Sequence, residues 1–162
     1  MATAFIRKTS VAALFLSAAF TGLGITGCSD EPDATSANTV PGRWFTAEQV
    51  AQGKDVFAAN CVTCHGDGAV GDPNWRKRGA DGLFPPPPLN GSAHAWHHPM
   101  AWLTSTITNG TPGGQGRMPA WGEKLSAEDI AATVAWFQSL WPEEIYSVWS
   151  EGNARYESNK GG

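Results

Sequence analysis

Two cysteines and a histidine stand together in the segment Cys61-Val62-Thr63-Cys64-His65. Two cysteines at this spacing can add across the two vinyl groups of one porphyrin, and the histidine that follows can then ligate the iron. Without the histidine, the same pair would also suit half of a zinc site or a thiol redox pair. A zinc site needs a second pair of ligands, but the only other cysteine is Cys28. No buried strand precedes Cys61, as a thioredoxin-type pair requires. The motif therefore predicts a covalently attached haem.

Two other clusters allow more than one interpretation. The segment from His94 to Met100 holds three histidines and a methionine, and imidazole and thioether groups both suit copper. The simpler interpretation is a surface loop in which His98 caps a helix that begins at Pro99, because the spacing shows no fixed ligand geometry. The basic run Arg76-Lys77-Arg78 could dock a redox partner or neutralise a haem propionate, although a solvated loop is again the simpler interpretation.

The N-terminus has the pattern of an export signal. The basic pair Arg7-Lys8 precedes an apolar stretch, Val11 to Ile25, which is too short to span a bilayer comfortably. The stretch ends in Leu23-Gly24-Ile25-Thr26-Gly27-Cys28, which resembles the end of a bacterial lipoprotein signal peptide. This resemblance implies that residues 1–27 are removed and that Cys28 becomes a lipidated N-terminus. The alternative is an ordinary signal peptide that leaves Cys28 as a free thiol.

The remaining chain is a single acidic domain on a tether. Removal of residues 1–27 from the 162-residue chain leaves 135 residues, enough for one domain with one core. Loss of the basic pair takes the net charge from −4 to −6, which argues against binding to nucleic acid. Residues 28–43 are polar and aperiodic, so we expect a lipidated, flexible tether with ordered structure starting at Trp44. Membrane association would then come from the lipid.

The periodicity of the domain predicts helices and no strands. The predicted helices cover residues 46–60, 99–109, 126–141 and 143 to about 156, with Gly- and Pro-rich loops between them. Capping boxes mark the starts at Thr46 and Ser126. Gly53 lies in mid-helix at a cost of about 1 kcal/mol relative to alanine, so we expect a packing reason for it. In the last helix, Ile145, Val148 and Trp149 are expected to share a face. Five of the eight tryptophans are expected in the core or beside the haem: Trp44, Trp96, Trp102, Trp136 and Trp141.

This layout resembles the class I c-type cytochromes between Gln49 and Trp141. Gly53 and Phe57 match the small residue and the aromatic of that family's first helix, and Trp136 matches the aromatic partner in its last helix. The segment Met118-Pro119-Ala120-Trp121 is similar to the family's loop that supplies the sixth iron ligand through its methionine sulfur. The resemblance implies an all-α cytochrome c fold whose helices pack around one covalently bound haem c.

The resemblance also implies a role for individual residues of the site. The proline carbonyl that accepts the Nδ1 proton of the proximal histidine would be that of Pro87, which would fix the ring angle of His65. The residues implied to hold the haem are Cys61 and Cys64 through thioether bonds, His65 and Met118 as axial iron ligands, and Pro87, Leu89 and Trp121 in the pocket.

A second methionine competes for the iron. Met100 lies at helical spacing with Leu103 and Ile107, which is typical of core packing because methionine fills apolar gaps. Met118 lies outside any helical pattern, where a core role is less natural. We therefore expect Met118 to be the ligand.

Together these features predict a single-electron carrier rather than an enzyme, made of a cytochrome domain at 44–142 and a C-terminal helix and tail at 143–162. Its partners would be redox proteins, one of which could be an oxidoreductase that it serves as subunit or donor. We expect a monomer in the bacterial cell envelope, outside the cytoplasm, anchored through Cys28. The alternatives are a haem sensor or peroxidase with a displaceable methionine, in which His97 or Arg117 would lie near the iron, and a copper-handling module built on the histidine loop.

Overall fold

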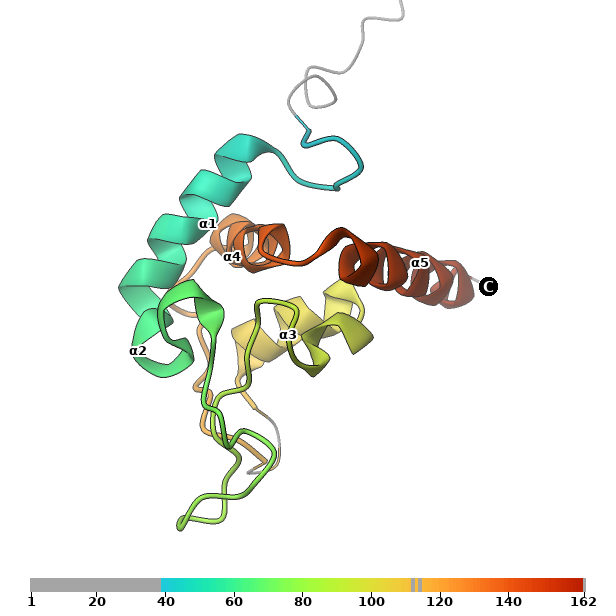
Figure 1. The fold of residues 1–162 in the computed structure, drawn as a ribbon. Helices are drawn as coiled ribbons and strands as arrows, with labels where there is room; N and C mark the ends of the chain where they lie inside the picture. Colours follow the sequence, from blue (N-terminus) through green and yellow to red (C-terminus); the bar gives the residue numbers. More distant parts are fainter. Residues whose placement is uncertain (1–38, 112, 114, 162) are drawn as a thin grey trace, which may run out of the picture. The chain divides into compact units, whose positions relative to one another are not determined.

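The computed structural model describes residues 39–111, 113 and 115–161 of the chain (Figure 1). Cys28 and the expected signal peptide lie outside the described residues. The elements are α1 (Ala47–Asn60), α2 (Val62–His65), η2 (Asp67–Ala69), η3 (His94–His97), α3 (Met100–Asn109), α4 (Ala127–Ser139) and α5 (Glu143–Lys160). The described part holds no β-strand, only isolated bridges that join Thr39 to Thr46 and Phe84 to Gly116. The all-α prediction is confirmed. None of the helices described is long and apolar enough to cross a membrane.

Two helices begin at the predicted capping boxes. At the start of α1, Gln49 N donates to Thr46 Oγ1 over 3.2 Å, and Thr46 N donates to Gln49 Oε1 over 2.9 Å. At the start of α4, Asp129 N donates to Ser126 Oγ over 3.0 Å, and the Asp129 carboxylate accepts from Ser126 N. Each box satisfies backbone N–H groups that would otherwise lack partners in the first turn. Both predicted starts are confirmed.

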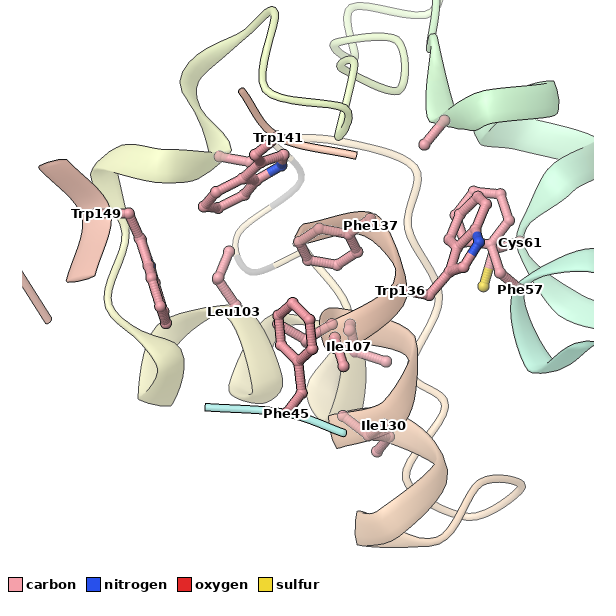
Figure 2. Close-up of a cluster of buried hydrophobic side chains, with 14 of the residues drawn as sticks. Phe45, Phe57, Cys61, Leu103, Ile107, Ile130, Trp136, Phe137, Trp141 and Trp149 are labelled. Carbon is pink, nitrogen blue, oxygen red and sulfur yellow. The ribbon is translucent and has the colours of Figure 1, made fainter. Parts of the chain in front are cut away.

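The missing side chain at Gly53 lets α1 and α4 cross closely. A Cβ added at Gly53 would overlap the backbone carbonyl of Ala132 in α4. On the same pair of helices, the rings of Phe57 and Trp136 pack with their centroids 4.2 Å apart, next to the sulfur of Cys61 (Figure 2). The expected packing reason for this glycine is therefore contact between two helix backbones.

The core continues from this crossing along α4 and α5. Its buried members include Phe45, Leu103, Ile107, Phe137, Trp141 and Trp149, which Figure 2 labels. Val134 and Tyr146 are buried as well. The expectation for Trp102 is wrong, because its side chain is 45% exposed and its ring stacks on the ring of His98 at the surface. Leu103, the next residue, takes the inward position on α3 instead.

The folded part begins before Trp44. Val40 N donates to the carbonyl of Phe45 over 2.9 Å. The Arg43 guanidinium lies 3.7 Å from the centre of the Tyr146 ring, and its Nη2 donates to Glu143 over 2.7 Å. Residues 40–43 therefore belong to the domain and are not part of the expected tether.

The helix α5 runs to Lys160, beyond the predicted end near residue 156. Its buried residues are Tyr146 and Trp149, whereas Val148 is 53% exposed, so the expected apolar face is wrong at Val148. The side chain of Asn153 accepts a hydrogen bond from Met100 N over 2.8 Å and so caps α3 from another helix. The expected cap by His98 is therefore wrong.

Candidate haem site

One helical turn presents both cysteines and the histidine of the motif. Cys61 ends α1, and α2 follows at once, with His65 N donating to Cys61 O over 2.9 Å. The Cys61 side chain is buried and that of Cys64 is exposed, and neither forms a disulfide. Burial, together with the neighbouring thiol of Cys64, raises the pKa of the Cys61 thiol to about 11. The turn therefore places two sulfurs and an imidazole on one short stretch of backbone.

The ring of His65 is buried and held from one side. His65 is only 8% exposed, and its Nδ1 lies 3.2 Å from the carbonyl oxygen of Pro87, the contact that the sequence resemblance implies. Burial lowers the pKa of His65 below its usual value, against a smaller opposing effect of the bond to Pro87. A neutral imidazole that donates from Nδ1 keeps a lone pair on Nε2, as a metal ligand must. Among the described residues, Nε2 has no hydrogen-bond partner.

Backbone hydrogen bonds bring the segment of Pro87 to the histidine. Gly71 N donates to His65 O over 2.7 Å, and Leu89 N donates to Ala69 O over 2.8 Å. A Cβ added at Gly71 would overlap the backbone of Pro87, so this approach requires a glycine. The indole N–H of Trp141 donates to the carbonyl of Leu89 over 2.7 Å and fixes the segment from its other end. The sequence does not indicate the approach of Gly71 to Pro87 or the bond from Trp141 to Leu89, because only the fold brings these residues together.

The loop that carries Met118 is hydrogen-bonded to the C-terminal half of α3 and to the residues just after it. Met118 O accepts from Thr111 N, and Trp121 N donates to Ile107 O, each over 3.0 Å. A Cβ at Gly110 would lie 2.7 Å from Met118 O, so this close approach also depends on a glycine. The side chains of Met118, Trp121 and Leu89 are partly buried and pack against the hydrophobic core.

The two methionines occupy opposite ends of α3. Met100 opens the helix and lines a hollow of about 580 Å³ together with Trp44, Tyr146 and Trp149. Met118 lies beside the residues that follow the last turn of α3. Met100 and Met118 are both partly buried and packed against the core, so the choice of Met118 as the ligand stays a prediction.

In the described part of the chain, no three His, Cys, Asp or Glu side chains come together as they would around a metal ion. The three histidine rings of the segment from His94 to Met100 stack on indoles instead. The centroid distances are 4.9 Å for His94 on Trp75, 3.7 Å for His97 on Trp96 and 3.9 Å for His98 on Trp102. This stacking favours the interpretation of the segment as a surface loop.

The residues present fit a covalently attached haem. The turn from Cys61 to His65 supplies two sulfurs and a buried imidazole whose Nδ1 is engaged by the carbonyl of Pro87. The loop at Met118 supplies a partly buried thioether that packs on the same core. These are the ligand types that c-type haem requires.

Comparison with known proteins agrees with this chemistry. Residues 48–137 match the family described as cytochrome C oxidase, cbb3-type, subunit III. The chain is 35% identical over 99 residues to the cbb3-type cytochrome c oxidase subunit CcoP of Azospirillum sp. (strain B510), covering 61% of this chain and 31% of that protein. It is 41% identical over 90 residues to the subunit FixP of Bradyrhizobium sp. (strain ORS 278), covering 56% and 27%. The alignments thus span about a third or less of these two relatives.

The alignment with another relative covers most of that protein's length. The chain is 31% identical over 84 residues to cytochrome c6 of Bryopsis maxima, covering 52% of this chain and 83% of that protein. No solved structure matches the chain significantly. With the motif, the helical fold and these relatives in agreement, the chain belongs to the c-type cytochromes of the cbb3-type oxidase subunit III family, and its cofactor is a covalently bound haem c.

Proposed function

We propose that the chain is a single-electron carrier whose haem iron is held between His65 and Met118. When bound, haem supplies a one-electron couple of the iron, and His/Met ligation favours the ferrous state. The observation that carries the proposal is the orientation of His65, whose Nδ1 lies 3.2 Å from the carbonyl oxygen of Pro87, which leaves Nε2 available to a metal. With both axial positions filled by protein, small ligands would be excluded. The test is carbon monoxide binding to the reduced protein. We expect no binding, and rapid binding would favour a sensor or peroxidase.

The surroundings of Met118 support a carrier over a peroxidase. Arg117 pairs with Asp81, with Nε 2.6 Å from Oδ2. His97 is exposed and stacks on Trp96. In the described part of the chain, Arg117 and His97, the two groups considered for peroxide chemistry, thus contact other side chains.

The thioether bonds are assigned to Cys61 and Cys64, and they give the first prediction. Haem should stay with the wild-type chain through acid extraction and denaturing electrophoresis. Cys64→Ala removes an exposed sulfur without disturbing the core, so loss of haem from this variant reports attachment alone. Cys61→Ala should lose haem and also stability, because Cys61 is only 8% exposed. Release of free haem b from the wild type would refute the assignment.

We propose a lipid anchor at Cys28 that holds the carrier on the outer side of a bacterial membrane as a monomer. Two or more acyl chains, at about 0.8 kcal/mol per buried methylene, hold a protein firmly. Growth with labelled fatty acid should label the wild type, and Cys28→Ser should abolish the label while leaving the haem spectrum unchanged. A Cys28→Ser variant that still carries the label would exclude this anchor.

The electron partners are proposed to be membrane-bound or extracytoplasmic redox proteins. Because two relatives are named as subunits of cbb3-type cytochrome c oxidases, a terminal oxidase is the first acceptor to assay. The chain would serve it as a subunit or as a donor.

A further inference from the structure

The loop of residues 78–84 is a compact turn held by its own hydrogen bonds. Gly79 N donates to Leu83 O over 2.8 Å, and Gly82 N donates to Gly79 O over 2.9 Å. The carboxylate of Asp81 accepts from Leu83 N over 3.1 Å, and Arg78 Nη1 donates to Gly82 O over 2.6 Å. These bonds fix the direction in which the loop presents Asp81.

The 78–84 loop is bonded to the three residues that precede Met118. Phe84 N donates to Gln115 O over 3.0 Å, within a parallel bridge between Phe84 and Gly116. Arg117 Nε donates to Asp81 Oδ2 over 2.6 Å. A weaker contact of 3.3 Å joins Arg78 Nη2 to the side chain of Gln115. Arg117 is the residue directly before Met118, so this ion pair acts one peptide bond from the proposed iron ligand.

On its other side, Met118 is bonded through its own carbonyl to Thr111 N over 3.0 Å. That contact comes from a residue just after α3, whereas the residues before Met118 are bonded to the 78–84 loop. The bond from Arg117, with a smaller contribution from Leu83 N, lowers the pKa of Asp81 to about 2. The carboxylate is therefore charged at every pH at which the protein would work.

We propose that Asp81 is a positioning residue for Met118. Through its bond to Arg117, Asp81 holds residues 115–118, the methionine loop, in a closed position. The inference rests on the proposed role of Met118 as the distal ligand. Asp81 touches neither the iron nor the haem in this scheme. It sets the equilibrium between a closed loop and an open loop in which an external ligand can replace the sulfur.

An exposed ion pair suits this role because it acts on a local equilibrium. The two side chains are 42% and 50% exposed, so the pair adds little to global stability. Local opening of a loop needs far less free energy than unfolding, and a small contribution therefore changes its population measurably. Removing the pair should increase the open population about twofold to fivefold.

The test measures displacement of the distal ligand by imidazole in the oxidised holoprotein. Asp81→Asn should raise the apparent affinity for imidazole by about twofold to fivefold, because the apparent affinity scales with the open population. The thermal unfolding temperature should stay close to that of the wild type. The affinity difference should shrink at high salt, since salt screens exposed charges.

A matched control removes an ion pair elsewhere. Glu151→Gln eliminates the exposed pair with Arg155 on α5, at 3.7 Å, and should leave imidazole affinity unchanged. The double variant Asp81→Asn with Arg117→Gln should raise the affinity no further than Asp81→Asn alone, because both substitutions remove the same ion pair. Equal affinities in Asp81→Asn, Glu151→Gln and the wild type would overturn the inference, as would effects of the two substitutions that add.

Failure of the underlying ligand assignment gives a different result. If Met118→Ala binds imidazole no more tightly than the wild type, Met118 does not occupy the iron and the proposed function loses its distal ligand. If Met118→Ala binds much more tightly while Asp81→Asn does not change, only the positioning role of Asp81 is wrong.

Discussion

Met118→Ala should abolish the weak far-red absorption band that a methionine–iron bond gives to the oxidised protein, and it should open the reduced iron to carbon monoxide. The sulfur that favours ferrous iron and blocks the sixth position would be gone. We expect the reduction potential to fall by on the order of 100 mV, a modest part of the range of about 0.8 V that axial ligands span. Optical spectra, redox titration and carbon monoxide binding measure the three effects, with the wild type expected to resist carbon monoxide at neutral pH.

Met100→Ala is the matched control for this experiment. Met100 is half-buried and lines a hollow at the start of α3. Its truncation should cost about 2 kcal/mol of stability, near the low end for methionine, and should leave the far-red band intact. The opposite pattern would transfer the ligand role to Met100. Unchanged spectra in both variants would point to a histidine ligand, with His94, His97 and His98 as the candidates.

Gly53→Ala should cost about 3 kcal/mol or more of the free energy of unfolding, even though alanine is the better helix former by about 1 kcal/mol. The added Cβ would overlap the carbonyl of Ala132 and would lie 2.9 Å from Thr133 N, and both are backbone atoms of α4 that cannot turn aside. The two helices would have to separate, which would also disturb the contact between Phe57 and Trp136. Denaturant unfolding of the holoprotein measures the loss.

The same substitution on α5 provides the comparison. A Cβ at Gly152 would meet only the end of the Arg155 side chain, 4.0 Å away, so Gly152→Ala should stabilise the protein by roughly 0.5–1 kcal/mol. Wild-type stability in Gly53→Ala would contradict the close crossing of α1 and α4.

Features that depend on neighbouring residues could be predicted from the sequence. The capping boxes at Thr46 and Ser126 are local signals, each contained between the N-cap and the third helical residue, and the structure confirms both helix starts. The haem motif is equally local, because Cys61 to His65 lie within one turn. Gly53 was identifiable as a position that needs a reason, since a glycine in mid-helix carries a cost that something must offset.

Features that depend on distant residues could not be predicted. The cap of α3 comes from Asn153 on α5, so the nearby histidine was the wrong candidate. The start of the domain was placed too late because Arg43 looks like part of a polar linker until Tyr146 and Glu143 pack against it. The 2.6 Å bond between Asp81 and Arg117 joins two loops without periodic patterns, and no rule of spacing connects them.

The bond from Trp141 to the carbonyl of Leu89 has a consequence for the order in which the domain matures. The ribosome makes Cys61, His65 and Pro87 long before it makes Trp141, which follows Leu89 by 52 residues. Trp149 likewise bonds to the carbonyl of His98 across 51 residues. A growing chain thus contains Cys61, His65 and Pro87 before it contains Trp141, the residue that donates to the carbonyl of Leu89. The residues proposed to ligate and attach the haem are therefore made before Trp141 and Trp149, whose hydrogen bonds hold the segments at Leu89 and His98.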